Sequence, residues 1–530
     1  MKRYIFNTLM CGALALGSFS CTDKYIDINS DPYQPGDLNP DDYALGSAMS
    51  NLAGTVISDD NNTAQFTDCL LGGTCGGYFA DSGAWPSSIG NFNATNDWTR
   101  VFLISDRIIP QLYPNLNTVK LVSQTTENPV PYAIAMVIKV AAMSRVTDAY
   151  GAIPYSQIGE EGKITVPYDS QEKVYDTFFN ELDSAIVTLT ENKDAALVPS
   201  ADFVYSGNVQ QWIKFANSLK LRLAMRISYA NPTKAKEMAE SAVKHEFGVI
   251  EENEDNAAWH YFGTITNSLF TVINYNGDES RPSADIVCYM NGYKDNRRAS
   301  YFKNEDGAWN QNTFVGLRRS IDRGSSASQY FSKYSAINIS AGDPVQWMNA
   351  AEVAFLRAEG VAVFGFDLGG TAQSFYEQGV RLSFEQWGAT GADEYLADDT
   401  SVPETYTDPA GANSYSSTIS DITIKWDESA TVEEKQERII TQKWIANWML
   451  GNEAWADYRR TGYPHLIPAT ATGNKSGGVV DSNRGVRRMP YPTEENTNNQ
   501  ENVQYARDNY LNGPDNMATD VWWACKKKNW

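Results

Sequence analysis

The sequence predicts a mostly α-helical protein, built from helical hairpins with long irregular loop excursions and minor β structure. Apolar residues recur at helical spacing in several separate segments. Between these segments lie long stretches rich in Gly, Asn, Ser, Thr and Pro, a composition typical of loops. No composition shift marks a linker between two halves, so we expect one intimately packed domain over residues 21–530.

Residues 1–20 have the features of a secretory signal peptide. Lys2 and Arg3 precede an apolar stretch that runs from about Ile5 to Phe19. Small residues then lead directly into Cys21, as in a bacterial lipobox, where cleavage leaves an acylated Cys as the new N-terminus. We therefore predict lipidation at Cys21. The alternative is an ordinary signal peptide with an incidental Cys near its end.

Helices are expected at residues 133–147, 171–189, 206–227, 233–245, 345–363, 372–384 and 432–450. In the clearest case, capping residues at 206–208 precede a stripe of apolar residues with i, i+3, i+4, i+7 spacing: Trp212, Phe215, Ala216, Leu219, Leu223 and Ile227. This helix should end before Pro232, because a residue that precedes Pro disfavours the helical region. The next helix completes a hairpin that resembles tetratricopeptide hairpins, although the chain has no regular repeat length.

The loop excursions are expected at about residues 59–96, 263–340, 391–429 and 465–500. The first two carry aromatic residues beside polar ones. A flat ring can cover the C–H face of a sugar while amides, carboxylates and guanidinium groups pair with its hydroxyls, and the same mixture suits a peptide. The alternative is that these rings fix the loops to the helical body. The candidate ligand-binding residues are Tyr78, Asp81, Trp85, Asn91, Tyr275, Arg281, Tyr289 and Trp309.

Cys69 and Cys75 lie six residues apart, with Gly72 and Gly73 between them. Paired glycines permit a tight loop, and an exported chain can form disulfides, so a local disulfide is possible there. Two free thiols are an equally open alternative. Metal binding is disfavoured, because no CxxC motif and no nearby His accompany the pair.

Composition excludes several function classes. The chain carries 43 Lys and Arg against 65 Asp and Glu, a net charge of −22, and therefore lacks the basic balance that a nucleic-acid partner requires. With only 3 His, neither a His-rich metal centre nor a metal cofactor is expected.

The sequence contains none of the common catalytic motifs for a nucleophilic serine, a zinc protease, a phosphate loop or a dinucleotide fold. A glycosidase carboxylate pair is defined by a separation of about 5–9.5 Å in space, which a sequence does not reveal. We expect a binding protein and no enzyme. A glycoside hydrolase and a structural or adhesive surface protein are the alternatives.

Four ordered motifs carry a resemblance to a known family. They are Asp148-Ala-Tyr-Gly-Ala-Ile-Pro-Tyr; the Trp212–Arg226 helix; Ala351-Glu-Val-Ala-Phe-Leu-Arg-Ala-Glu359; and a C-terminal set at Gln442–Ala446, Glu453–Pro464 and Arg488–Glu494. Together with Cys21 they resemble the SusD/RagB-type nutrient-binding outer-membrane lipoproteins of Bacteroidetes. The resemblance covers nearly the whole mature chain.

The resemblance implies a surface lipoprotein that pairs with a SusC/RagA-type TonB-dependent transporter and sits on it as a lid. The ligand would be an oligosaccharide or, as in other members, an oligopeptide, captured without bond chemistry and without a cofactor. No ligand-contacting residue carries over, because such residues lie in variable loops in this family.

The motif residues themselves are expected to be architectural. Large apolar side chains of the C-terminal motif should be core: Trp444, Ile445, Trp448 and Trp455. Arg459 and Arg460 should meet backbone carbonyls or buried carboxylates such as Glu352 or Glu359.

Overall fold

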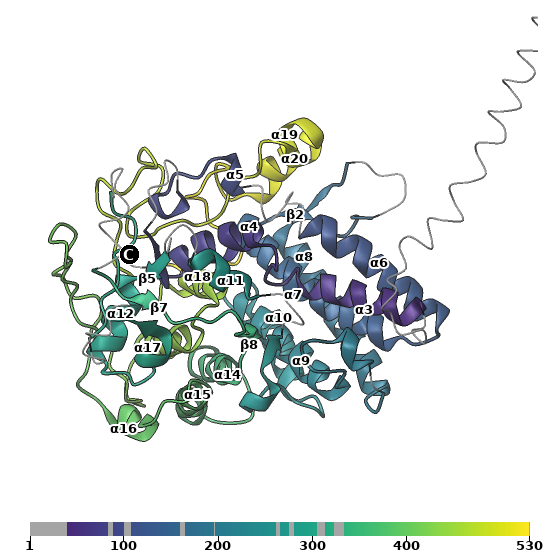
Figure 1. The fold of residues 1–530 in the computed structure, drawn as a ribbon, viewed down its shortest axis with the longest axis horizontal. Coiled ribbons are helices and arrows are strands. Elements are labelled where there is room, and N and C mark those ends of the chain that lie inside the picture. Colours follow the sequence, from purple (N-terminus) through teal and green to yellow (C-terminus); the bar gives the residue numbers. More distant parts are fainter. Residues whose placement is uncertain are drawn as a thin grey trace, which may run out of the picture.

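The computed structural model describes residues 40–82, 88–99, 108–159, 165–195, 197–260, 266–274, 280–304, 313–322 and 333–528. Helices dominate this part of the chain, as predicted, and named strands occur in it as two-stranded antiparallel pairs. Figure 1 shows the long helices of residues 109–226 gathered on one side of the molecule.

The N-terminal half is an array of helices in which neighbours in sequence pack together (Figure 1). It contains α3 (Pro40–Ala53), α4 (Asn61–Ala64), the π-helix η1 (Gln65–Gly73), α5 (Asn96–Thr99), α6 (Ile109–Thr125), α7 (Val130–Tyr150), α8 (Gln171–Glu191), α9 (Val209–Arg226) and α10 (Pro232–Val243). Short 3-10 turns are η2 (Ile89–Asn91), η3 (Pro199–Ala201) and η4 (Asn253–Asp255). Helix α3 packs on α6, α6 on α7, α7 on α8, α8 on α9, and α9 on α10.

The second half adds α11 (Ser268–Ile273), α12 (Ala284–Gly292), α13 (Arg298–Tyr301), α14 (Ala350–Phe364), α15 (Ala372–Gln386), α16 (Ala392–Ala397), α17 (Val432–Ala446), α18 (Gly451–Thr461), α19 (Glu495–Asn498) and α20 (Gln500–Tyr510). The strand pairs are β1 (Phe79–Asp81) with β5 (Ser280–Pro282), β2 (Ile153–Pro154) with β3 (Tyr168–Asp169), β4 (Ala257–Trp259) with β8 (Val345–Met348), and β6 (Phe302–Lys303) with β7 (Ala336–Ile337). Helix α14 packs on α9, α15 and α17, which ties the two halves together.

The hairpin predicted around Trp212 is confirmed as α9 and α10. Asn208 caps α9 by accepting hydrogen bonds from the N–H groups of Gln210 and Gln211. The predicted apolar stripe is fully buried, and Asn231 caps α10 directly before Pro232. Capping chemistry and helical periodicity thus determine both helices locally.

Two predicted helix boundaries are wrong. Residues 345–348 form strand β8 against β4, and helix α14 begins only at Ala350, because the side chain of Asn349 accepts a hydrogen bond from the Glu352 N–H at 2.8 Å and caps it there. The helix predicted to reach residue 450 ends at Ala446. After a turn with Met449 at a positive φ of 79°, the chain resumes as α18.

Helix α7 is the central helix of the N-terminal array. It is long and apolar enough to cross a membrane by length and composition, yet 83% of its most apolar stretch is buried inside the protein. Its neighbours α6, α8 and α9 cover it. A helix that is apolar on all sides is one that other helices surround.

Candidate functional site

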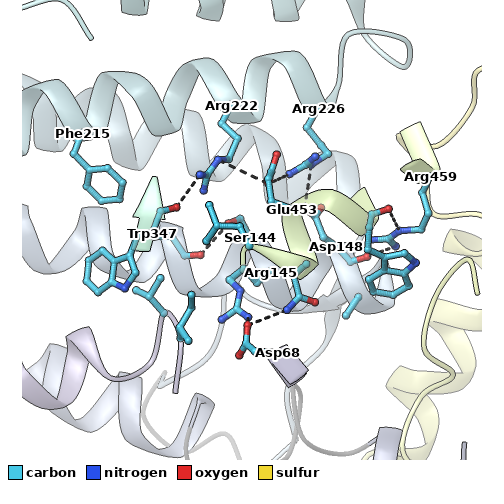
Figure 2. A pocket seen from close by; sticks show the side chains of 17 residues that line it. Asp68, Ser144, Arg145, Asp148, Phe215, Arg222, Arg226, Trp347, Glu453 and Arg459 are labelled. Atoms are coloured by element: carbon cyan, nitrogen blue, oxygen red, sulfur yellow. Dashed lines mark hydrogen bonds and ion pairs between the residues drawn. The ribbon is translucent and has the colours of Figure 1, made fainter. Parts of the chain in front are cut away.

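A network of buried charges joins α7, α9 and α18 (Figure 2). Arg226 Nε donates to Asp148 Oδ2 at 3.2 Å, and Arg226 Nη2 also pairs with Glu453. Arg222, one helical turn before Arg226, donates from Nη2 to the Trp347 carbonyl oxygen at 2.8 Å. Residues i and i+4 share a helix face, so α9 presents both guanidinium groups on one side, where Glu453 lies within ion-pair distance of both.

The network continues into α14 and α17. Arg222 Nη2 lies 2.6 Å from Glu352 Oε2. Lys443 Nζ lies 2.6 Å from Asp457 Oδ2 and 3.0 Å from Glu453 Oε1. Buried charges are tolerated only when they are paired, and these pairs satisfy that condition across four helices.

Burial and the neighbouring cations together set the pKa values of the buried carboxyl groups in this network. Burial by itself would raise the pKa of Glu453, but Arg226, Lys443 and Arg222 outweigh it and hold the pKa well below its ordinary value. At Asp148 the balance is reversed, because burial outweighs Arg226 and raises the pKa. The pKa values of the two carboxyl groups on Arg226 are therefore shifted in opposite directions.

The cavity inside this network is small. Arg145 of α7 pairs with Asp68 of η1, and Asn452 Nδ2 donates to Asp68 Oδ1 at 3.1 Å, which closes one wall. The free volume is about 40 Å³, room for a few water molecules rather than a sugar ring. The charged groups are paired with one another, so we assign this cavity a structural role.

A larger cavity lies between α11, β8, the end of α15 and the turn after α17. Its free volume is about 240 Å³. We call it the amide–indole cavity; its polar and aromatic lining includes Gln346, Gln386, Trp387 and Trp448, and its aliphatic lining includes Ile57, Leu269, Ile339 and Val345. Asn338 and Asp343, which also line it, are exposed, so the cavity reaches the protein surface on that side.

Local structure holds the indole rings in place. The ring of Tyr301 is stacked on Trp448 with centroids 5.2 Å apart and meets Trp387 edge-on at 4.6 Å. Ser300 Oγ donates to the Trp387 carbonyl oxygen at 2.8 Å, and Tyr301 OH donates to the Ile445 carbonyl oxygen at 2.9 Å. Aromatic pairs in these geometries attract each other beyond simple burial, so both indoles are fixed before any ligand arrives.

Four polar atoms of the lining are buried without a hydrogen-bond partner among the described residues. They are the side-chain oxygens of Gln346 and Gln386 and the indole nitrogens of Trp387 and Trp448. An unsatisfied buried donor or acceptor costs about 1–3 kcal/mol. Because these four atoms have almost no accessible surface, they lie behind the cavity wall and do not face its open volume.

The sequence-predicted ligand residues lie elsewhere. Tyr78, Asp81, Asn91, Arg281 and Tyr289 are all buried, with 5% exposure or less. Pairing of β1 with β5 brings the first two loop excursions together, with Ala80 opposite Arg281. The two excursions therefore meet, but these five side chains face the interior.

Their contacts explain the burial. Tyr78 OH donates to the Trp444 carbonyl oxygen at 2.5 Å and Tyr289 OH donates to the His465 carbonyl oxygen at 3.0 Å. Asn91 Nδ2 donates to the carbonyl oxygens of Ile321 and Gly473 at 3.0 and 2.8 Å. These residues fix loops to the helical body, the alternative that the sequence left open. Trp85, Tyr275, Trp309 and Cys21, the residue predicted to be lipidated, lie outside the described residues.

Cys69 and Cys75 are buried and are not joined by a disulfide, so the possible disulfide is not formed. The chain is helical from Gln65 through Cys75. Six residues of helix separate two Cα atoms by about 9 Å, beyond the roughly 4.4–6.8 Å that a disulfide spans. Burial raises the pKa of the Cys75 thiol to about 12, which leaves it unreactive.

The expected architecture of the C-terminal motif is confirmed. Arg460 Nη1 and Nη2 donate to the two carboxylate oxygens of Glu359, each at 2.7 Å. Arg459 Nη1 donates to the carbonyl oxygens of Asp148 and Arg487 at 2.6 and 3.0 Å. The large apolar side chains of the motif are buried: Trp444, Ile445, Trp448 and Trp455. Among the described residues, no group of three or more His, Cys, Asp or Glu side chains is placed to hold a metal ion.

Sequence reasoning missed the amide–indole cavity. Gln386 and Trp387 lie just beyond the helix predicted at residues 372–384, at the end of the observed α15, and Gln346 lies in a segment predicted as helix. A Trp directly before Gly388, where a helix should stop, is the one local signal that could have pointed to it. The cavity otherwise arises from the meeting of segments far apart in sequence.

Comparisons place this fold among known proteins. The family model SusD-like, described as SusD and RagB outer membrane lipoprotein, matches residues 27–524. Among curated proteins, none shows significant sequence similarity to the chain.

Solved structures are similar over nearly the whole length. A SusD homologue from Bacteroides uniformis is 70% identical, with 91% of this chain and 100% of that chain covered and a TM-score of 0.89. A SusD homologue from Bacteroides thetaiotaomicron is 40% identical, with 91% and 99% covered and a TM-score of 0.84. A chitin-binding SusD homologue from Flavobacterium johnsoniae is 36% identical, with 92% and 100% covered and a TM-score of 0.84. The chain therefore belongs to the SusD-like family of SusD and RagB outer membrane lipoproteins.

Proposed function

We propose that this outer membrane lipoprotein captures an oligosaccharide at the cell surface and serves as the lid of a SusC-type TonB-dependent transporter. Family membership over residues 27–524 supports the lipoprotein role. The observation that carries the choice of a sugar is the similarity, at 36% identity over 92% of the chain, to a SusD homologue described as chitin-binding. The alternative with the same role is an oligopeptide ligand.

The amide–indole cavity supports this reading chemically. Indole rings, side-chain amides and an aliphatic floor can accept the C–H face of a sugar ring together with its polar groups. Asp343 is the one acidic side chain among the described residues that line the cavity. Glycoside hydrolysis needs two carboxyl groups across the scissile bond, so this lining favours binding without cleavage.

In this mechanism the protein contributes capture and closure. Oligosaccharide binds the lid, and closure onto the barrel traps it between the two proteins. A ligand that contacts both components stabilises the closed state by its differential affinity for that state. The buried ionic network keeps α7, α9, α14, α17 and α18 in one rigid body, so the lid can move as a unit.

The test is binding without turnover. The purified chain, without its signal peptide, is applied to a glycan array and to a peptide library, and products of any retained oligosaccharide are analysed by chromatography. We expect retained oligosaccharides that stay intact. Retention of peptides alone, or catalytic hydrolysis of a glycan, would contradict the proposal.

A further inference from the structure

We propose that a second cavity, lined by Asn291, Arg298 and Glu404, binds an uncharged sugar unit of the captured oligosaccharide through two adjacent hydroxyl groups. We call it the Arg–Asn–Glu cavity. This inference rests on the proposed function and names the sugar class and the place where it is recognised.

The Arg–Asn–Glu cavity lies between α12, the segment 313–316 and the loop 404–407. Its free volume of about 320 Å³ falls within the roughly 300–1,000 Å³ typical of sites that enclose a small ligand. It shares no described lining residue with the amide–indole cavity. Four of its lining residues are exposed, so the cavity opens to the surface: Thr313, Glu404, Thr405 and Thr407.

Two glycines allow the walls of this cavity to pack directly against α12 and its cap. A Cβ atom at Gly292 would lie 2.2 Å from the Val402 carbonyl oxygen, and one at Gly316 would lie 2.4 Å from the Ser283 carbonyl oxygen. Glycine, which has no Cβ atom, permits such close approaches of backbone to backbone. Both walls are therefore held in place before any ligand arrives.

Hydrogen bonds join the three polar side chains of the cavity. Asn291 Nδ2 donates to Glu404 Oε1 at 2.9 Å, and Arg298 Nη1 donates to Asn291 Oδ1 at 3.3 Å. Asn291 also donates to the Phe314 carbonyl oxygen at 2.8 Å, which ties it to the facing wall. Asn291 and Arg298 are half-buried and Glu404 is exposed, so a ligand in the cavity can reach these residues.

The lining places a group that only accepts hydrogen bonds near one that only donates them. The ionised carboxylate of Glu404 has acceptor oxygens alone, whereas the guanidinium of Arg298 has N–H donors and no acceptor. Two adjacent sugar hydroxyls satisfy both, because one donates to the carboxylate while its neighbour accepts from the guanidinium. The exposed hydroxyl groups of Thr313, Thr405 and Thr407 add further donors and acceptors to the lining.

The same two ions disfavour a charged sugar. Burial raises the pKa of Glu404 although Asn291 and Arg298 act against it, and burial lowers the pKa of Arg298. Both ions are therefore already partly dehydrated. A sugar carboxylate or sulfate would place a second anion near Glu404, and an ammonium would place a second cation near Arg298. An uncharged sugar avoids both repulsions.

A zwitterion, such as a free amino acid or a dipeptide, also carries a cation and an anion close together. The three exposed threonine hydroxyls favour the sugar, because they match further hydroxyl groups and offer no charge. Alanyl-alanine is therefore the competing ligand, and its binding is an outcome of the test.

The first experiment applies the mature chain to a glycan array of neutral oligosaccharides and matched counterparts. In each counterpart one hexose carries a carboxylate at C6, or one ring hydroxyl is replaced by hydrogen. The best neutral glycan, its counterparts and alanyl-alanine are then compared by isothermal titration calorimetry. We expect the carboxylate form, and at least one deoxy form, to bind at least about tenfold more weakly than the neutral parent, the effect of one lost hydrogen bond to a charged group.

The second experiment locates the site. Glu404→Gln removes the negative charge and keeps an oxygen that can accept from Asn291, and Arg298→Lys keeps the positive charge but loses the planar guanidinium. Each should weaken binding of the best neutral glycan about tenfold, with little change in melting temperature.

Two matched controls make the same changes outside this cavity. Glu394→Gln alters an exposed carboxylate in α16, and Arg381→Lys alters an exposed guanidinium in α15. Neither residue lines the Arg–Asn–Glu cavity, so the affinity of both control variants should equal that of the parent.

The outcomes separate the two proposals. Equal binding of the neutral glycan and all its deoxy forms, preference for the carboxylate form or for alanyl-alanine, or unchanged affinity in both cavity variants would overturn the inference. Oligosaccharide binding that persists in those cases leaves the proposed function standing. Absence of any glycan binding on the array would overturn the proposed function and the inference with it.

Discussion

Arg460 and Glu359 form a bidentate ion pair that is almost completely buried, with side-chain exposures of 1% and 0%. Gln436 Nε2 also donates to Glu359 Oε1 at 2.6 Å, and Asp457 Oδ1 lies 3.1 Å from Arg460 Nη2. Each partner alone would be an uncompensated charge in a low-dielectric interior. The pair therefore specifies how α14, α17 and α18 meet, and losing one member should be costly.

We expect Arg460→Met to lower the free energy of unfolding by about 3–5 kcal/mol, because it leaves the Glu359 carboxylate buried without its main partner. Urea denaturation followed by circular dichroism measures the change. Lys244→Met is the matched control, since it breaks an exposed pair with Asp367 and should alter stability little. An Arg460→Met protein as stable as the parent would contradict the assigned role of the pair.

The pH dependence of stability follows from the lowered pKa of Glu453. The unfolded chain takes up this proton near the ordinary pKa of 4.5, and the folded chain only at lower pH. Glu453 therefore stabilises the fold above pH 4.5, and this contribution is lost as the pH falls from there toward the folded-state pKa. Urea unfolding at neutral pH and at several acidic values should show that decline.

Glu453→Gln should reduce stability at neutral pH and make the acid decline shallower. Asp148→Asn tests the opposite sign, because the raised pKa of Asp148 means that the folded state binds this proton first, which offsets part of the decline. Removing it should make the decline steeper. Identical pH profiles for the parent and Glu453→Gln would show that this carboxylate does not govern acid stability.

Among the elements, α14 depends on a single side chain for its start. Asn349 caps the helix and its Nδ2 also donates to Asn447 Oδ1 at 3.0 Å, which links the cap to the end of α17. Because both residues are buried, water cannot replace these bonds. Strand β8 ends one residue before this cap, directly beside the amide–indole cavity.

We expect Asn349→Ala to lower the free energy of unfolding by about 1–2 kcal/mol through loss of the cap. Thermal and urea unfolding measure it. Asn509→Ala provides the control, because Asn509 is exposed within α20 and its replacement by a better helix former should be neutral or slightly stabilising. A neutral Asn349→Ala would argue that neighbouring backbone groups position α14 without the cap.

Elements with local signals were predictable from the sequence. A cap, an apolar stripe and a following Pro determine α9 and the start of α10 without reference to the rest of the chain. Strand β8 was missed because its partner β4 lies more than 80 residues away, and apolar residues in a short segment suit a strand or a helix equally.

The candidate site was less predictable for the same reason. Aromatic loop residues such as Tyr78 and Tyr289 are buried by packing against Trp444, which composition does not disclose. The amide–indole cavity draws its lining from segments between Ile57 and Met449. Only the three-dimensional arrangement shows which polar atoms there lack partners.

For the whole molecule, the fold unites a helical array and a loop-rich half through α9, α14 and the ionic network (Figure 1). Such a body offers a large surface to a partner while its interior stays fixed. The proposed lid role makes two demands on it: the protein must be held at the membrane, and it must meet the transporter in a ligand-dependent way.

We expect the native lipoprotein, extracted in mild detergent, to co-purify with a TonB-dependent barrel, and saturating oligosaccharide to increase the closed fraction of the complex, as seen by electron cryo-microscopy. Ligand that contacts both lid and barrel favours the closed state by linkage, whereas ligand bound equally well to both states would not shift the equilibrium.

Cys21→Ala separates the anchor from the docking contact, because it should release the protein from membranes while the purified chain still binds the solubilised barrel. Acyl chains stabilise membrane attachment by about 0.8 kcal/mol for each buried CH₂. The Cys21→Ala protein lacks them and should therefore appear in the soluble fraction. Retention of Cys21→Ala on membranes that lack the transporter would refute the lipid anchor, and recovery of the lipoprotein alone from wild-type membranes would refute the lid.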